Sequence, residues 1–165
     1  MKKVVLLALI VLIFSCKSNS EQELKNINLC INQWHKAAAD ADFETYFNLM
    51  TDDAVFIGTD ASENWNKKEF EIYSKPHFDK GKAWTFHSLE RNVYTDKNQK
   101  IAWFDELLDT SFKICRGSGV LEKVNGTWKI KHYVLSMTIP NEKAKDVIVT
   151  KDSLESIFIQ KLKSK

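Results

Sequence analysis

Two predicted strands near the end of the sequence, paired in a hairpin, could place a histidine ring beside an unfilled space in the fold. His132 lies in an alternating run that an Asn-Gly pair joins to an earlier run, which is typical of a two-residue β-hairpin. In that register Gly119 lies opposite His132, and Gly117 lies opposite Val134. Two glycines beside a histidine predict a pocket. A β-bulge at the glycines is the alternative, because it would change which side chains share a face.

An acidic residue on the preceding predicted strand, 100–109, could act together with His132. Asp105 and Glu106 lie in an apolar run, where alternation directs one carboxylate inward and the other outward. We expect Asp105 and His132 to form an acid–base pair whose pKa values adjust to one another. A structural ion pair of the inward acid with Arg91 or Arg116 fits the pattern equally well.

The remaining residue patterns narrow the chemistry further. His35 lies one step off the apolar stripe of the first helix, so we expect it to face solvent. The sequence has no GxSxG or Cys-His nucleophile signature, no phosphate-binding or dinucleotide-binding glycine loop, and no metal-ligand motif. We therefore expect neither a cofactor nor a bound metal.

Periodicity and capping residues indicate the elements that must position these side chains. Apolar residues at steps of three and four mark a first helix over 24–38, and Asp42 can cap a short second helix. Asn66 and Glu69 form a capping box before a third helix, which we expect to end near Ser74 because a proline follows. The expected strands are 54–58, 83–94, 100–109, 112–124 and 127–139, and an amphipathic helix with Leu154, Ile157, Phe158 and Leu162 ends the chain. Helices followed by antiparallel hairpins predict an α+β fold whose sheet curls over the helices.

The first sixteen residues are typical of an export signal. Two lysines precede eleven residues without a polar side chain, 4–14, and this run is too short to span a bilayer comfortably. The stretch Ile13–Cys16 resembles the lipobox of bacterial lipoproteins. The resemblance implies cleavage before Cys16, acylation of Cys16, and an anchor in the cell envelope, on the periplasmic side or at the cell surface. An ordinary signal peptide or an uncleaved anchor is the alternative. The short tether 17–20 would then hold the domain near the membrane.

Composition limits the partners and the number of domains. Removal of residues 1–15 takes away two lysines and lowers the formal net charge from +2 to 0, so nucleic-acid binding is not expected. Cys30 and Cys115 could pair in an oxidising compartment or remain two separate buried thiols. About 145 residues remain for folding, which suits one core. The expected organisation is a signal peptide (1–15), a lipidated cysteine with its tether (16–20), one domain (21–142) and a C-terminal extension (143–165).

Several stretches of the sequence resemble the SnoaL-like branch of the nuclear transport factor 2-like superfamily. They are Trp34–Asp42, Phe56–Asp60, Ala102–Glu106, and Arg116–Leu121 continuing to Gly126–Ile130. The resemblance implies a cone-shaped roll in which a curved, mostly antiparallel sheet wraps over N-terminal helices. It also implies a pocket in the mouth of the cone and frequently a homodimer. Ketosteroid isomerase, the best-known catalyst of the superfamily, carries its base at the end of the first strand. Gly58 takes that position here, so we do not expect that mechanism.

These patterns lead to three hypotheses about function. The first is a lipid-anchored domain that binds a small, largely apolar molecule in the cone. The second is a cofactor-free isomerase, cyclase or hydratase that uses His132 and Asp105. The third is a protein-interaction module whose outer sheet face carries Val120, Tyr133 and Leu135, unless the C-terminal helix or a second subunit covers that face. The expected ligand-binding residues are Trp34, Phe56, Thr59, Trp65, Trp84, Asp105, Gly117, Gly119, His132 and Val134.

Overall fold

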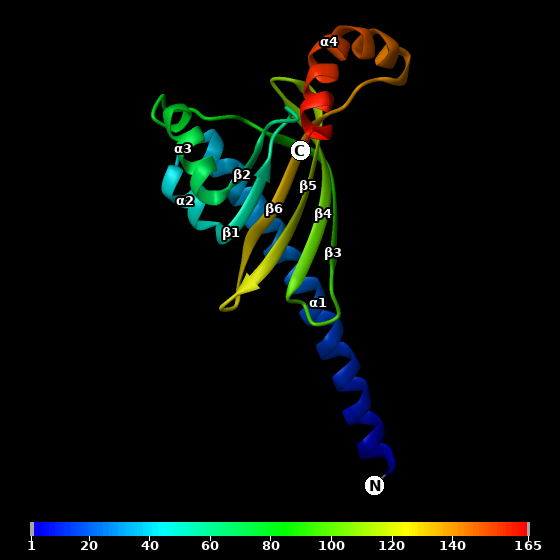
Figure 1. The fold of residues 1–165 in the computed structure, drawn as a ribbon. Coiled ribbons are helices and arrows are strands. Elements are labelled where there is room, and N and C mark those ends of the chain that lie inside the picture. The colour runs from blue at the N-terminus through cyan, green and yellow to red at the C-terminus, as the bar shows by residue number, and fades with distance from the viewer. Residues whose placement is uncertain (1, 165) are drawn as a thin grey trace.

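The computed structural model describes residues 2–164, with side chains from residue 20 onward. Its elements are α1 (Lys2–Ala39), α2 (Phe43–Asn48), β1 (Met50–Ile57), β2 (Asn64–Asn66), α3 (Lys67–Phe78), β3 (His87–Thr95), β4 (Ile101–Thr110), β5 (Lys113–Val124), β6 (Thr127–Met137), the 3-10 helix η1 (Asn141–Lys143) and α4 (Ala144–Lys163). The six strands form one curved sheet in the order β2-β1-β6-β5-β4-β3, which curls over α1 (Figure 1). β1 and β6 are parallel, whereas every other neighbouring pair is antiparallel. The predicted α+β fold with a mostly antiparallel sheet is confirmed.

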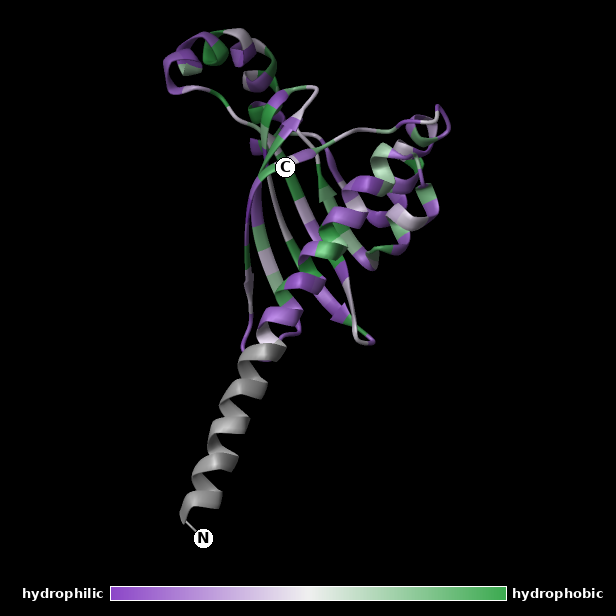
Figure 2. Cartoon of the chain, turned by 180° about the vertical axis from the view of Figure 1, so that it is seen from behind, coloured by the Kyte–Doolittle hydropathy of each residue, from purple (hydrophilic) through white to green (hydrophobic). Residues whose placement is uncertain are grey.

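Helix α1 supplies one side of the core. Ile27, Ile31, Trp34 and Ala38 belong to the stripe that the sequence predicts, and all four are 0% exposed. Steps of three and four residues place them on one face of the helix, against the concave side of the sheet. Figure 2 shows apolar and polar residues alternating along the strands, as expected when one face of a sheet packs on the core.

Local capping signals are confirmed, but the end of α3 differs from the prediction. The Asn66 side chain accepts a hydrogen bond from the Glu69 amide, and the Glu69 carboxylate accepts one from the Asn66 amide. The helix continues through Pro76 to Phe78 instead of ending near Ser74. Pro76 lies in the last turn, where a missing N–H removes a single helical hydrogen bond. Burial of the Phe78 ring in the core then favours the extra turn.

Two segments differ from the predicted strand limits. β3 begins at His87, and the preceding residues 83–86 form an extended segment that packs its aromatic side chains under the sheet. β1 begins at Met50, four residues before the predicted start, and the short strand β2 was not predicted. The late start of β3 arises because apolar residues packed on the core from irregular backbone give the same alternating pattern as a strand. The added residues of β1 and the strand β2 are largely polar, so they show no such pattern.

The β5–β6 hairpin contains a bulge, but it lies on β6 and not at the glycines of β5, where the sequence left it as the alternative. Its register shifts between Val120 and Leu121, which makes Lys131 the extra residue on β6. The pairs are Leu121 with Ile130, Val120 with His132, Gly119 with Tyr133, and Gly117 with Leu135. The prediction that Gly119 pairs with His132 is therefore wrong. Beyond the bulge the two faces are exchanged: Tyr133 and Leu135 are buried in the core, whereas His132 and Val134 belong to the outer sheet face.

Helix α4 packs on little of the rest of the chain. It follows β6 at the end of the sheet opposite the start of α1 (Figure 1), and it buries none of its residues. Its apolar side chains therefore do not cover the outer sheet face. The predicted signal sequence and Cys16 lie outside the residues whose side chains are described. Among those residues, no helix is both long enough and apolar enough to cross a membrane.

Candidate functional site

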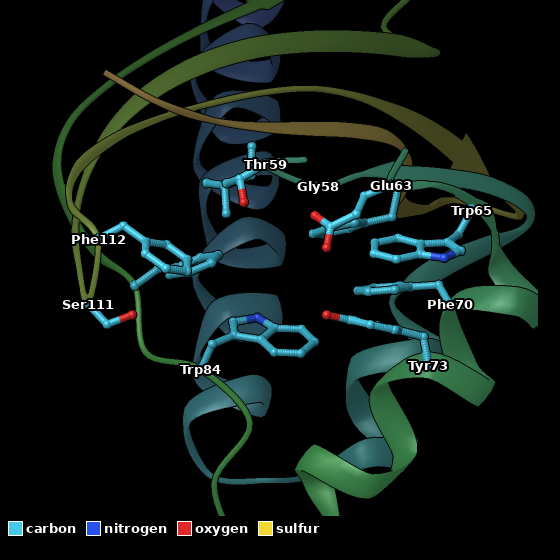
Figure 3. A pocket seen from close by; sticks show the side chains of 12 residues that line it. Gly58, Thr59, Glu63, Trp65, Phe70, Tyr73, Trp84, Ser111 and Phe112 are labelled. Atoms are coloured by element: carbon cyan, nitrogen blue, oxygen red, sulfur yellow. The ribbon is translucent and has the colours of Figure 1, made fainter. Parts of the chain in front are cut away.

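One pocket, here called the cone pocket, lies where the sheet opens away from α1. Its volume is about 160 Å³. The end of β1, helix α3, the segment before β3 and the β4–β5 turn supply its walls (Figure 3). The lining residues are Phe56, Gly58, Thr59, Glu63, Trp65, Phe70, Tyr73, Trp84, Phe86, Ser111, Phe112 and Leu135.

Stacked aromatic rings form one wall of the cone pocket. The Phe56 and Phe70 rings stack at a centroid distance of 4.0 Å and an angle of 13°. Trp65 stacks on Tyr73 at 4.3 Å and on Phe70 at 5.7 Å, and Trp84 lies 5.8 Å from Phe70. Rings that are fixed against one another lose little freedom when a ligand binds, so the wall is rigid before any ligand arrives.

A carboxylate enters this aromatic site from the loop after β1. A β-carbon on residue 58 would overlap Oε2 of Glu63, so Gly58 leaves the space that this side chain occupies. The Gly58 amide donates to the Glu63 carbonyl at 3.0 Å, and the Asp60 amide donates to Oε2 at 3.1 Å. Figure 3 shows the carboxylate directed toward the middle of the pocket. Gly58 itself carries no acid, as the sequence shows, but Glu63 places a carboxylate beside it.

The local sequence contained a signal for this turn. Asp60 Oδ1 accepts a hydrogen bond from the Ser62 amide at 2.8 Å, which is the short-range bond of an Asx turn. Such a turn reverses the chain within a few residues and returns Glu63 to Gly58. An Asp-x-Ser sequence directly after a strand could therefore have indicated Glu63.

Tyr73 provides a second polar group in the cone pocket. Its hydroxyl points into the pocket from α3, on the side where the Glu63 carboxylate lies (Figure 3). Partial burial raises the pKa of Tyr73, and the negative charge of Glu63 raises it further. The phenol therefore stays protonated at neutral pH and can donate a hydrogen bond to a ligand.

A second polar group of residues, the Glu106 cluster, is buried between α1 and the sheet. Glu106 is 1% exposed. Its Oε1 accepts hydrogen bonds from His35 Nε2 at 2.7 Å and from the Tyr133 hydroxyl at 3.1 Å. Its Oε2 accepts two from Arg91, at 2.9 and 2.8 Å. Four donors occupy both oxygens, so this carboxylate has no free lone pair with which to accept a proton from a ligand.

The charges in the Glu106 cluster balance its burial. Burial by itself raises the pKa of Glu106, but the hydrogen bonds from His35 and Arg91 and the positive charge of Arg91 outweigh it and hold the pKa below its ordinary value. Burial and the charge of Glu106 raise the pKa of Tyr133, which keeps its hydroxyl a donor. The inward acid is thus Glu106, in the ion pair with Arg91 that the sequence left open. The prediction that His35 faces solvent is wrong, since its side chain is 6% exposed.

Four of the predicted ligand-binding residues meet at the cone pocket: Phe56, Thr59, Trp65 and Trp84. Trp34 is buried deeper in the core, where its ring stacks on Tyr46 at 4.9 Å. Gly117 and Gly119 leave no open space. A β-carbon on Gly117 would overlap the Tyr133 hydroxyl, and one on Gly119 would lie 2.6 Å from the Phe104 ring. The two glycines therefore leave room for the Tyr133 and Phe104 rings in the core.

Asp105, His132 and Val134 lie on the outer sheet face, away from the cone pocket. Asp105 is 3.5 Å from Arg116 and forms no hydrogen bond with His132. The bulge turns His132 to the same face as Asp105, but strand β5 separates the two, with Asp105 opposite Ser118 and His132 opposite Val120. The expected acid–base pair is therefore not formed in the part of the chain that the structure describes.

The two cysteines of the domain are both free and buried. The Cys30 thiol donates to the Trp128 carbonyl at 3.2 Å, and burial raises its pKa to about 12. A thiol held in its neutral form is a poor nucleophile and a poor metal ligand. Among the described residues, no group of three or more histidine, cysteine, aspartate or glutamate side chains could hold a metal ion.

Residues 27–140, which include both the cone pocket and the Glu106 cluster, match the sequence pattern of the SnoaL-like domain. The chain belongs to this family. An NTF2-like protein of unknown function from Pseudomonas putida has a similar fold, with a TM-score of 0.61 and 16% identity over 75% of this chain and 92% of that one. A structure from Streptomyces avermitilis is described as a candidate dehydratase of the NTF2-like family. Its TM-score is 0.64, with 11% sequence identity over 73% of this chain and 99% of that one.

A third solved structure also has a fold similar to that of this chain. The NTF2-like protein from Cytophaga hutchinsonii has a TM-score of 0.55 and 15% identity over 68% of this chain and 95% of that one. At such identities the likeness establishes the fold alone. No protein with a curated description matches the sequence.

Proposed function

We propose that this SnoaL-like protein binds a small, largely apolar molecule in the cone pocket. The observation that carries the proposal is the lining itself, which contains seven aromatic side chains and, besides the Tyr73 hydroxyl, only three residues with polar side chains: Thr59, Glu63 and Ser111. Ligand sites are typically apolar cavities with a few polar groups that fix orientation. An engineered cavity of about 150 Å³ holds benzene, so a pocket of this size fits a ligand with about one ring.

The proposal includes a lipid anchor on Cys16 in the cell envelope. The structure supports a ligand that enters from the side away from the membrane. The Trp128 indole donates to Glu23 in the middle of α1, and the Ala83 amide donates to Ala38 near the pocket end of the helix. Fifteen helical steps separate Glu23 from Ala38, a distance of about 22 Å. The pocket therefore opens at the end of the domain farthest from the tether.

A substitution at the anchor tests this part of the proposal. Cys16→Ser removes the thiol that would be acylated, so labelling of cells with an alkyne-bearing fatty acid should no longer mark the protein. Cys30→Ser is the matched control and should keep the label. Labelling of the Cys16→Ser protein at the wild-type level would contradict the anchor.

Binding can be tested through the tryptophan indole resonances of the full-length protein in lipid nanodiscs. On titration with toluene, the N–H signals of Trp65 and Trp84 should shift, whereas those of Trp103 and Trp128 should not. Ser111→Phe should fill the mouth of the pocket and abolish the shifts. Ser118→Phe, on the outer sheet face, is the matched control and should keep them. Unchanged Trp65 and Trp84 signals with toluene and with other single-ring probes would overturn the proposal.

One observation favours a second function, a cofactor-free enzyme that moves a proton. Oε1 of Glu63 accepts no hydrogen bond from any residue that the structure describes, and the Tyr73 hydroxyl lies on the same side of the pocket. A free carboxylate oxygen near a phenol donor can act as a base beside a carbonyl group. The candidate dehydratase among the similar structures has the same fold. This pair replaces His132 and Asp105 as the proposed acid and base.

Deuterium exchange would test the enzyme hypothesis. In D2O the protein should accelerate exchange of the α-hydrogens of cyclohexanone, as followed by NMR. Glu63→Gln should remove the acceleration, and Glu90→Gln, a carboxylate substitution on the outer sheet face, should retain it. No acceleration by the wild-type protein would exclude this chemistry for simple ketones and leave the binding function in place.

The outer sheet face supports a homodimer. A row of side chains crosses five strands there, namely Tyr94, Trp103, Val120, His132 and Val55. The Tyr94 and Trp103 rings stack at 5.9 Å and are 48% and 45% exposed. Exposed aromatic rings in a continuous row are typical of a protein-interaction surface.

A further inference from the structure

We infer that the ligand of the cone pocket carries a protonated amine on its apolar body. The inference rests on the proposed binding function and names the chemical class of the ligand. Its central observation is that Glu63 is the one charged side chain among the described residues that line the pocket.

The environment of Glu63 sets which ligands its carboxylate accepts. Oε2 is held by the Asp60 amide, and Oε1 has no partner among the described residues. No lysine, arginine or histidine lies among the twelve lining residues to balance the charge. A neutral apolar ligand would displace water from Oε1 and leave the charge unpaired, which is unfavourable.

A negatively charged ligand fits the pocket even less well. Its charge would meet that of Glu63 with no basic side chain in the lining to offset the repulsion. An ammonium group, in contrast, can donate a charge-assisted hydrogen bond to Oε1, and such bonds are about twice as strong as neutral ones. Of the three charge classes, the cation alone satisfies the unpaired oxygen and neutralises the site.

The aromatic rings define the rest of the ligand. The wall formed by Phe56, Trp65 and Phe70 is apolar and fixed by stacking, and the volume of about 160 Å³ leaves room for about one ring. The Tyr73 hydroxyl offers one further polar contact near the carboxylate. A single-ring arylalkylamine therefore matches both parts of the pocket.

Matched probes of one shape test the inference. Benzylamine, benzyl alcohol and benzoate have similar sizes and carry a positive, a neutral and a negative group at neutral pH. Titrated into the full-length protein in nanodiscs, benzylamine should bind at least about tenfold more tightly than benzyl alcohol. Benzoate should bind more weakly than both. Added salt should weaken benzylamine binding and leave benzyl alcohol binding unchanged.

Two variants locate the effect at the carboxylate. Glu63→Gln should abolish the preference for benzylamine while retaining the affinity for benzyl alcohol, and the control Glu90→Gln should retain the preference. Gly58→Ala keeps the charge but places a β-carbon where Oε2 lies, so it should also reduce the preference.

The outcomes separate this inference from the binding function. Equal affinities for benzylamine and benzyl alcohol, or a preference that persists in Glu63→Gln, would overturn the inference and leave the binding function standing. Tighter binding of benzoate would also overturn it. If none of the three probes binds and toluene does not bind either, both proposals are wrong.

Discussion

The carboxylate of Glu106 accepts a hydrogen bond from His35 Nε2 at 2.7 Å, although 71 residues separate them in the sequence. His35 comes from α1 and Glu106 from β4, the strand next to the edge strand β3, so this contact ties the helix to that side of the sheet. Arg91, from β3, binds the other carboxylate oxygen. A buried carboxylate with four donors from three further elements holds the cone in one arrangement.

Loss of the charge at Glu106 should destabilise the fold strongly. Glu106→Gln leaves Arg91 buried without a counter-charge, and breaking such a pair from one side typically costs about 3–5 kcal/mol. The free energy of unfolding, measured by urea denaturation, should fall by an amount in that range. Asp105→Asn changes the neighbouring, more exposed acid and should cost less than about 1 kcal/mol. Equal losses for the two variants would contradict the role given to Glu106.

The stability of the fold should decrease under acid conditions. The pKa of Glu106 is lower in the folded protein than its ordinary value of 4.5. A carboxyl with a lowered pKa stabilises the fold above its unfolded pKa, and this contribution disappears as the pH falls through the folded value. Stability should therefore decline below about pH 4.5. Glu106→Gln should reduce the steepness of this decline, which denaturation at a series of pH values would measure. An unchanged slope would show that other carboxyl groups account for it.

A methyl group at Gly117 should disturb the same cluster from the opposite strand. Its β-carbon would displace the Tyr133 hydroxyl, which donates to Glu106. Gly117→Ala should therefore destabilise the protein by about 2 kcal/mol. Combination with Tyr133→Phe removes the overlapping atom, so the double variant should lose less than the sum of the single ones. Ser118→Ala, on the outer sheet face, should change stability by less than about 0.5 kcal/mol.

The outer sheet face should mediate dimerisation. Trp103→Glu places a charge in the middle of the exposed aromatic row and should convert a dimer into a monomer. Sedimentation equilibrium in density-matched detergent would report the mass. Lys97→Glu adds a negative charge in the β3–β4 turn and should leave the dimer intact. A wild-type protein that sediments as a monomer would remove this proposal.

Short-range patterns predicted most of the elements because their causes are local. The stripe containing Ile27 and Trp34 predicted the buried face of α1, since helical periodicity depends only on the spacing of neighbours. The Asn66–Glu69 capping box formed as predicted for the same reason. The pairing of Leu121 with Ile130 next to the hairpin turn was predicted correctly. The residues beyond Lys131 were assigned to the wrong face, because the one-residue bulge there reverses every later position and leaves no distinct pattern in the sequence.

The sequence by itself determined the family, the α+β class and three of the seven aromatic residues of the pocket, Phe56, Trp65 and Trp84. Motifs, helix faces, caps and turns follow from residues close together in the chain. Only the tertiary structure decided which acids matter. Glu106 became the centre of a buried cluster because α1, β3 and β6 bring donors to it. Glu63 became the pocket carboxylate because Gly58 leaves room for it. Both depend on contacts made through space: the Asx turn after β1 indicates that Glu63 returns toward Gly58, but not that aromatic rings surround it there.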